Sequence, residues 1–194
     1  MTLPLAKSLW SERFERDSCG FGLIAHLEGR GSHELVQTAV QALVRLTHRG
    51  AVAADGRTGD GCGLLMAAPT RFLEKIAGDA GLTTGELFAA GLVFLNPSVE
   101  GAARARRRLD EMMAREGLLP AGWRPVPIDE SACGDQALRS LPRIEHVFVS
   151  APEGMAPAEF DRRLFVARRR AEMSLEDRDP VFYVGSLSHS TLLW

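Results

Sequence analysis

Asp17-Ser18-Cys19-Gly20-Phe21-Gly22-Leu23-Ile24-Ala25 is the stretch on which the interpretation of this chain depends. It joins a polar, irregular segment to a short apolar run that predicts a buried strand over residues 21–27. Residues 1–18 carry mixed charges and an early Pro4, which favour an accessible segment that can be cleaved. We therefore interpret residues 1–18 as a leader and Cys19 as the first residue of the working protein.

Two further blocks follow Cys19 along the chain. The first is Leu46-Thr47-His48-Arg49-Gly50-Ala51-Val52-Ala53-Ala54-Asp55-Gly56, and the second is Thr58-Gly59-Asp60-Gly61-Cys62-Gly63. In this order and spacing, the three blocks resemble the mature start of the large chain of the glutamate synthases, a family whose glutaminase domain is a type 2 glutamine amidotransferase. The informative part of the resemblance covers residues 17–72, with weaker likeness to the end of the chain.

The resemblance implies a fold and a division of the chain. The family's glutaminase domain has the N-terminal-nucleophile hydrolase fold, an α+β four-layer αββα sandwich with antiparallel sheets. Residues 1–18 would then be a leader or propeptide, and residues 19–194 the N-terminal part of the glutaminase domain. We expect the sandwich to be incomplete in this chain. The family's oxyanion-hole pair, Asn-Gly, does not occur, because Asn96 is the only asparagine and Pro97 follows it; this pair and the groups that hold the substrate's carboxylate and amino group are expected beyond residue 194.

Composition narrows the class of protein independently. The chain has 194 residues, 45% hydrophobic and 25% charged, which fits one globular domain. A net charge of −2 gives no reason to expect nucleic acid. Three widely spaced cysteines form neither a disulfide framework nor a zinc pattern, so no metal site is predicted and a reducing, cytoplasmic setting is expected. No apolar run reaches the ~20 residues that a membrane crossing needs.

Periodicity predicts the secondary structure in outline. A helix should begin after Ser32, a good N-cap, and run to about His48 before Gly50. Residues 120–142 predict only an extended segment. The grouping of the strands favours α+β with antiparallel sheets. The remaining expected strands are 64–68, 92–95 and 143–150, with a closing hairpin of 181–187 and 190–194; the remaining expected helices are 69–77, 102–116 and 157–175.

Cys19 is the predicted catalytic residue. A thiolate is a strong nucleophile, but a free cysteine is mostly protonated near pH 7 and needs a base. Removal of residues 1–18 would give Cys19 a free α-amino group, whose reference pKa of about 8 suits proton transfer. Gly20 would leave room beside the thiol for a substrate. The alternative is that Cys19 is a small core residue, which is the common role of a free cysteine.

The glycine-rich loop contributes the other candidates. In the related family the arginine at Arg49 lies near the nucleophile, where a guanidinium would favour the thiolate; the alternative is a solvated charge at a helix end. Asp60 could shape the substrate pocket or an edge that contacts the synthase domains. A nucleotide P-loop is excluded, because residues 58–63 lack its lysine and Ser/Thr. We interpret His48 as structural, Cys62 as a packing residue and Cys133 as a bystander.

The arginine clusters 104–108 and 162–170 fall in helical patterns beside acidic residues. They indicate solvated helix faces, or else a contact with another domain or subunit.

The resemblance also implies a reaction and its partners. Cys19 would attack the side-chain amide of L-glutamine and release ammonia for transfer to 2-oxoglutarate, giving glutamate. FMN and an iron–sulfur cluster would belong to later domains of the full enzyme, with a small reductase subunit or ferredoxin as partner. The chain alone should hydrolyse little glutamine. Two alternatives stay open: a stand-alone amidohydrolase of the same fold, and a catalytically silent regulatory or assembly module.

Overall fold

The computed structural model describes residues 20–46 and 50–194, and these fall into two compact units. The described residues up to residue 51 form the N-terminal unit, and residues 52–194 form the C-terminal unit. Each is built around its own elements.

The described part of the N-terminal unit contains the helix α1 (His33–Arg45). The Ser32 hydroxyl accepts a hydrogen bond from the backbone N–H of Leu35 at 3.2 Å, so the predicted N-cap is confirmed. Glu34 lies in the first turn, where the helix dipole favours negative charge. The helix ends at Arg45, a few residues before the expected end at His48, and Leu46 closes it by donating to the carbonyls of Ala42 and Leu43.

The strand predicted over residues 21–27 does not form. This segment is irregular and exposed, with Phe21 93% and Leu23 89% accessible, and it turns where Gly29 N–H donates to the His26 carbonyl at 2.9 Å. A strand needs a neighbour to pair with its backbone groups. The described part of the N-terminal unit contains no strand that could pair with residues 21–27. The backbone groups of this segment therefore have no sheet neighbour, and the predicted strand is wrong.

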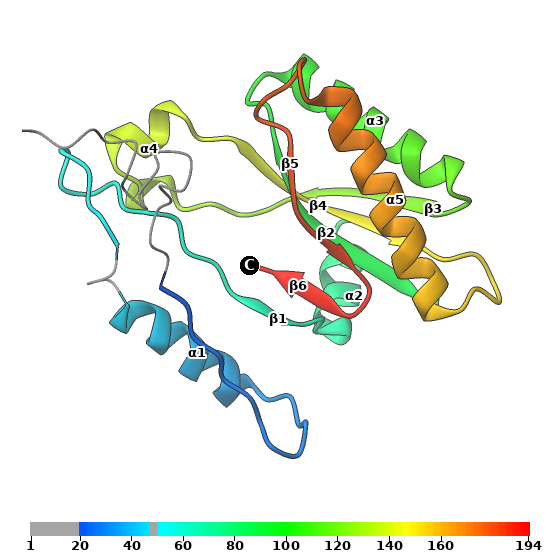
Figure 1. Ribbon diagram of the computed structural model, residues 1–194, viewed down its shortest axis with the longest axis horizontal. Coiled ribbons are helices and arrows are strands. Elements are labelled where there is room, and N and C mark those ends of the chain that lie inside the picture. The colour runs from blue at the N-terminus through cyan, green and yellow to red at the C-terminus, as the bar shows by residue number, and fades with distance from the viewer. Residues whose placement is uncertain (1–19, 47–49) are drawn as a thin grey trace, which may run out of the picture. The chain divides into compact units, whose positions relative to one another are not determined.

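The C-terminal unit is organised by an antiparallel four-stranded sheet of order β3-β4-β2-β5 (Figure 1). Its strands are β2 (Phe88–Leu95), β3 (Leu119–Pro125), β4 (Arg143–Ser150) and β5 (Tyr183–Ser188). β2 and β4 pair along their whole length, from Phe88 opposite Ser150 to Leu95 opposite Arg143. β4 has the predicted bounds, whereas β2 begins earlier than expected. β3 is a strand and overlaps the start of the segment that was predicted only to be extended.

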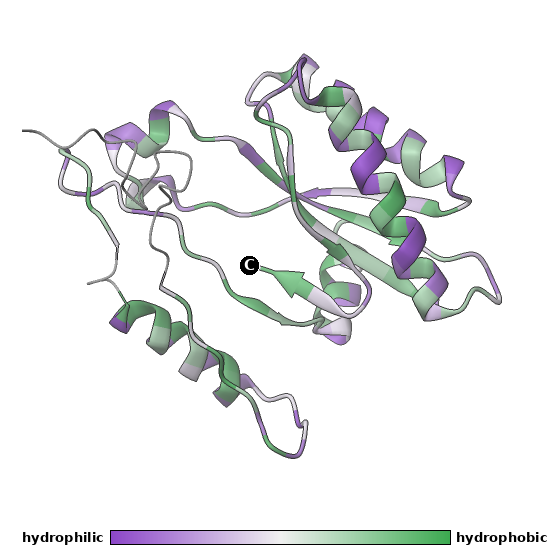
Figure 2. Cartoon of the chain, in the orientation of Figure 1, coloured by the Kyte–Doolittle hydropathy of each residue, from purple (hydrophilic) through white to green (hydrophobic). Residues whose placement is uncertain are grey.

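Two long helices cover one face of this sheet (Figure 1). They are α3 (Val99–Arg115) and α5 (Pro157–Leu175), and both match predicted helices closely. Alternate residues of β2 and β4 point to this face, as the period-2 geometry of a strand requires. The apolar sides of the helices lie toward the sheet and their charged sides away from it, as the colouring of Figure 2 shows. The core includes Ala89, Val93, Leu95, Leu109, Met113, Val147, Val149, Phe160 and Leu164.

Shorter elements cover the opposite face. They are α2 (Thr70–Asp79), β1 (Leu65–Ala67) and β6 (Thr191–Leu193). β1 and β6 form a separate antiparallel pair, with Leu65 opposite Leu193. The expected hairpin between residues 181–187 and 190–194 is therefore wrong: β5 pairs with β2, while β6 turns away, pairs with β1 and buries Leu192 against α2. The second core cluster includes Leu73, Ile76, Phe88, Ala90, Phe148 and Leu192.

The described residues therefore form an α+β fold with antiparallel sheets, which confirms the predicted class. Within them, helices lie on both faces of one four-stranded sheet, and the second sheet has two strands.

Most arginines of the two clusters lie on the outer sides of α3 and α5, whereas Arg106 of α3 pairs with the buried Glu145 of β4. Most make local ion pairs: Glu159 binds Arg162 and Arg163 at 2.7 and 2.6 Å, and Glu172 binds Arg168 and Arg169 at similar distances. These side-chain hydrogen bonds lower the pKa of Glu159 to about 2. The pairs have the i,i+3 and i,i+4 spacing that stabilises helices modestly, which agrees with the expected charged helix faces.

Candidate functional site

The predicted site residues are distributed unevenly over the described structure. Cys19 and Arg49, together with His48, lie outside the described residues. Gly20 is the first described residue, exposed and irregular, in the N-terminal unit. Asp60 is exposed in the C-terminal unit, directly after a short bridge. The loop that precedes Asp60 is therefore the part of the candidate site whose geometry the structure describes.

This loop, residues 52–59, is closed on itself; we call it the glycine loop. Val52 and Gly59 form an antiparallel bridge, and Ala53 N–H donates to the Thr58 carbonyl at 2.7 Å. The turn is completed by Gly56 N–H donating to the Ala53 carbonyl at 3.0 Å. Gly56 has φ +70°, a conformation that glycine adopts without steric cost. Gly56 thus allows the tight turn of this loop, in agreement with the prediction that the glycine-rich segment has a defined shape.

The Asp55 carboxylate accepts hydrogen bonds from other residues of the glycine loop. One carboxylate oxygen, Oδ1, accepts from Arg57 N–H at 3.0 Å and from Thr58 N–H at 2.7 Å. The other, Oδ2, accepts from the Thr58 hydroxyl at 2.5 Å. These hydrogen bonds, led by that of the Thr58 hydroxyl, hold the pKa of Asp55 well below its usual range. Asp55 is therefore an ionised acceptor at any working pH.

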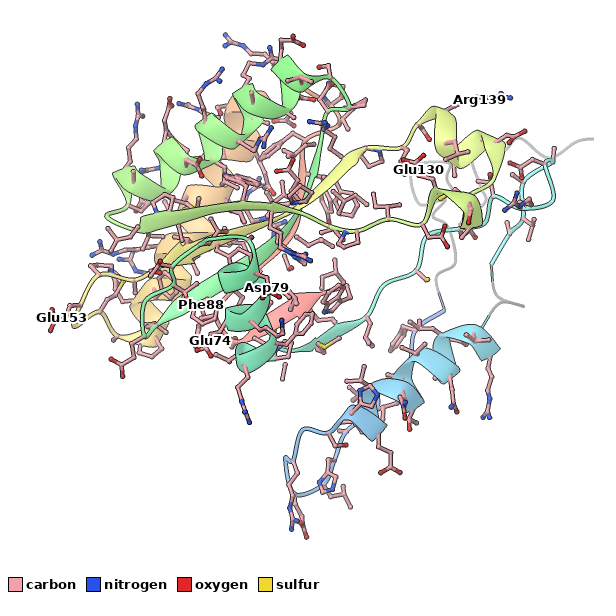
Figure 3. All side chains as sticks on the ribbon, turned by 180° about the vertical axis from the view of Figure 1, so that it is seen from behind. Glu74, Asp79, Phe88, Glu130, Arg139 and Glu153 are labelled. Atoms are coloured by element: carbon pink, nitrogen blue, oxygen red, sulfur yellow. The ribbon has the colours of Figure 1, made fainter. Side chains whose placement is uncertain are left out.

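The same residues bind a segment far along the sequence. This segment contains a short 3₁₀ turn, η4 (Glu130–Ala132), and the helix α4 (Asp135–Arg139). Asp55 Oδ2 accepts from Gln136 N–H at 3.1 Å, and Thr58 Oγ1 accepts from Ala137 N–H at 3.2 Å. Figure 3 shows this segment, marked by Glu130 and Arg139, beside the glycine loop.

The Arg57 guanidinium adds a third link, donating to the Ser131 carbonyl at 2.5 Å. We call this set of hydrogen bonds the clasp: Asp55, Arg57 and Thr58 on one side, and Ser131, Gln136 and Ala137 on the other.

Sequence reasoning did not find the clasp, although a signal was present. Asp55 and Thr58 have the spacing and residue types that commonly hydrogen-bond nearby backbone N–H groups. At the other end, Gly134 occupies the N-cap position of α4 and offers no side chain to its first N–H groups. The uncapped helix and the hydrogen-bonding loop are 81 residues apart, measured from Asp55 to Gln136. Local patterns cannot match partners at that separation.

The described cysteines show no catalytic environment. Cys62, which we expected to pack in the interior, is exposed between two glycines that bring no side chains to cover it. Cys133 is partly buried, and its thiol lies 3.8 Å from the Asp129 carbonyl. In the described ranges no three His, Cys, Asp or Glu side chains gather as a metal site would require. None of the helices described is both long and apolar enough for a membrane crossing.

A separate cavity of about 620 Å³ lies between α3 and the end of α5. None of the candidate site residues that the structure describes borders it, so the cavity is separate from the described part of that site. Its lining is rich in arginine: Arg104, Arg107, Arg108, Glu111, Met173, Ser174, Leu175, Asp177 and Arg178.

Comparison with known families gives a match to the model described as "Glutamine amidotransferases class-II", over residues 19–194. Among curated proteins, the chain is 33% identical over 193 residues to the glutamate synthase [NADPH] large chain of Bacillus subtilis, covering 99% of this chain and 13% of that protein. It is 38% identical over 182 residues to ferredoxin-dependent glutamate synthase 2 of Synechocystis, covering 93% and 12%. It is 35% identical over 201 residues to the glutamate synthase [NADH] of Schizosaccharomyces pombe, covering 99% and 9%.

The matched region is the N-terminal part of glutamate synthase large chains. The chain spans about a tenth of the length of these relatives.

Proposed function

The chain belongs to the class-II glutamine amidotransferases, and from this premise we propose that it is the glutaminase portion of a glutamate synthase with Cys19 as its nucleophile. The observation that carries the proposal is the start of the family match. It begins at residue 19 and continues through residue 194, so the segment that precedes Cys19 lies outside the family domain. This boundary coincides with the one expected from the sequence, where a leader would be removed to expose Cys19.

The chemistry follows from the position of the cysteine. With residues 1–18 removed, the α-amino group of Cys19 takes the thiol proton, and the thiolate attacks the side-chain amide carbon of L-glutamine. The carbon–nitrogen bond breaks, the nitrogen leaves as ammonia with the transferred proton, and a γ-glutamyl thioester remains. Water then attacks the thioester, which releases glutamate and restores the thiol. The balance is glutamine and water giving glutamate and ammonia.

The other candidates have supporting roles in this proposal. Arg49 places a guanidinium near the thiol and favours the thiolate. Gly20 leaves space beside the sulfur for the substrate amide. Asp60, on the segment that leaves the glycine loop, shapes the substrate pocket or an edge toward the synthase domains. Residues 1–18 act as a propeptide in this proposal, because an amide nitrogen before Cys19 cannot serve as the base.

The remaining parts of the reaction belong to the longer protein. The names of the relatives include ferredoxin-dependent and NADPH- or NADH-linked glutamate synthases. We infer that the ammonia is transferred to 2-oxoglutarate in later domains that hold FMN and an iron–sulfur cluster, and that the glutaminase fold is completed there as a four-layer sandwich. The described residues of this chain offer no ligand set that fits such a cluster, and no step is assigned to it.

Replacement of each cysteine in the full-length protein tests the proposal. Cys19→Ala should lower the rate of glutamine hydrolysis at least about 100-fold, because the nucleophile is lost. Cys62→Ala and Cys133→Ala are the matched controls and should keep the rate within about twofold. Thermal unfolding of all three variants shows whether each is folded. Glutamine hydrolysis that persists in a folded Cys19→Ala protein would contradict the proposal, because the nucleophile would then be another group.

A further inference from the structure

The helix α4 has no N-cap side chain of its own. Its N-cap residue is Gly134, and the N–H groups of Gln136 and Ala137 would otherwise lack acceptors within the helix. Asp55 Oδ2 and Thr58 Oγ1 accept these two hydrogen bonds from the glycine loop, 81 and 79 residues away. The first turn of α4 is therefore capped by protein groups from another part of the chain, which leaves no room there for a ligand.

Gly134 permits this close approach. The residue is buried, and a Cβ added to it would lie 2.5 Å from the Thr58 nitrogen and 2.7 Å from Asp55 Oδ2, and closer still to Thr58 Oγ1. No side chain can occupy that space while the loop keeps its position. The contact is thus specific in shape as well as in hydrogen bonding.

The same two side chains also define the conformation of the glycine loop. The Thr58 hydroxyl donates to Asp55 Oδ2 while accepting from Ala137 N–H, and Asp55 Oδ1 accepts from two N–H groups of the loop. Closing the loop and binding α4 therefore use the same atoms. The loop cannot change its turn without breaking the cap of α4.

Chain connectivity relates this fixed loop to the proposed site. Asp60 directly follows Gly59, the last residue of the glycine loop. Val52 and Gly59 are bridged. We propose that Asp55 and Thr58 are positioning residues of the glutaminase site, which fix the glycine loop against α4 and so anchor the segment that carries Asp60. The inference rests on the proposed roles of Cys19 and Asp60.

A positioning role differs from a structural one in what it predicts. If the clasp only stabilises the fold, its loss lowers the unfolding temperature and leaves the chemistry of the folded protein unchanged. If it positions the site, the folded protein reacts more slowly, because small displacements of catalytic groups reduce rates strongly. Thr58 is the residue to change, because Thr58→Val keeps the shape and removes the hydroxyl, while Thr58→Ser keeps the hydroxyl.

The experiment uses the full-length protein with Thr58→Val, Thr58→Ser and the control Thr83→Val, which changes an exposed threonine outside the clasp. Backbone hydrogen exchange over residues 133–138 reports the cap of α4. The rate at which a glutamine-analogue electrophile labels Cys19, and kcat/KM for glutamine hydrolysis, report the site. All are measured below the unfolding temperature of every variant.

We expect Thr58→Val to speed exchange over residues 133–138 and to reduce both labelling and kcat/KM about 10–100-fold, with Thr58→Ser and Thr83→Val within about twofold of the unchanged protein. Unaltered exchange in Thr58→Val would show that the clasp does not cap α4. Faster exchange with unaltered labelling would show that the clasp stabilises the fold without positioning the site. Either of these two outcomes overturns the inference, and neither contradicts the role of Cys19 as nucleophile. Failure to label Cys19 in the unchanged protein would contradict the proposed function and, with it, the positioning role.

Discussion

At the scale of single residues, the C-terminal unit contains a buried histidine without a hydrogen-bond partner. His146 lies on β4, fully buried, with both ring nitrogens unpaired among the described residues. Its ring packs edge-on against Phe148 and Trp194, with centroids 6.2 and 5.4 Å away, and Leu92 and Arg124 flank it on the neighbouring strands. Burial, with Arg124 nearby, lowers the pKa of His146 from 6.5 to about 4. The fold therefore requires a neutral imidazole.

This requirement predicts a pH-dependent stability. Between pH 6.5 and about 4 the unfolded chain binds a proton at His146 that the folded protein does not, so the free energy of unfolding falls as the pH falls. The loss should amount to between about 1 and 3 kcal/mol after allowance for solvent screening. Urea unfolding at pH 7 and pH 4.5 measures it, and His146→Leu should remove this part of the slope. An equal slope in the variant would contradict the assignment.

A buried carboxylate, that of Glu145, has an ion pair. Its side chain is 5% exposed and lies 3.4 Å from the Arg106 guanidinium of α3. Glu145 Oε2 has no hydrogen bond among the described residues. The ion pair with Arg106 is therefore the described interaction that offsets the cost of burying this carboxylate. Breaking one half of a buried pair is strongly destabilising, because the other charge is left in a poor solvent.

We therefore expect Arg106→Met to lower the free energy of unfolding by about 3–5 kcal/mol. The double variant Arg106→Met/Glu145→Leu should lose less than the single one, because the buried Glu145 carboxylate is then no longer left without its partner. Arg107→Met, at an exposed position on the same helix, should change the free energy by no more than about 0.5 kcal/mol. Denaturant titration measures all three. A single variant as stable as the double variant would show that the ion pair does not compensate Glu145.

At the scale of elements, α5 illustrates how an apolar stripe fixes a helix on the sheet. Phe160, Leu164, Ala167 and Ala171 recur at helical spacing and are fully buried, while the arginines between them pair with acids on the outer side. This arrangement was predictable because it depends on local periodicity alone. Ser32 capping α1 was predictable for the same reason.

Neighbouring positions of α5 provide a direct test of this packing. Leu164 is fully buried and Phe165 is 63% exposed. Leu164→Ala should lower the free energy of unfolding by about 2–5 kcal/mol, because it removes buried methyl groups and leaves a cavity. Phe165→Ala should cost no more than about 0.5 kcal/mol. Similar losses at both positions, in urea titrations, would contradict the packing of α5 on the sheet.

Elements that depend on distant partners were less predictable. Residues 21–27 have the apolar character of a strand but no strand beside them among the described residues of their unit. β6 follows β5 closely in sequence, yet its backbone groups pair with β1, more than a hundred residues earlier. The clasp is of the same kind, since Asp55 and Gln136 meet only in the folded unit. The periodicity of a sequence predicts which face of an element is apolar, but it does not predict which distant segment packs on that face.

At the scale of the whole molecule, the chain combines a family domain with a segment that precedes it. The family match covers residues 19–194 and leaves residues 1–18 outside. The identity of that family was predictable, because three ordered sequence blocks carry it without reference to tertiary structure. The roles of Cys19 and Arg49 stay predictions, since both residues lie outside the described structure.

The account depends on Cys19 gaining a free amine when the preceding residues are removed. Intact-mass spectrometry of the full-length protein, before and after treatment with a glutamine-analogue electrophile, tests this most directly. We predict a mature chain that begins at Cys19 and gains one label, located on that residue by peptide mapping, while a variant that keeps residues 1–18 gains none. A protein that retains residues 1–18 and still hydrolyses glutamine, or a label found on another residue, would contradict it.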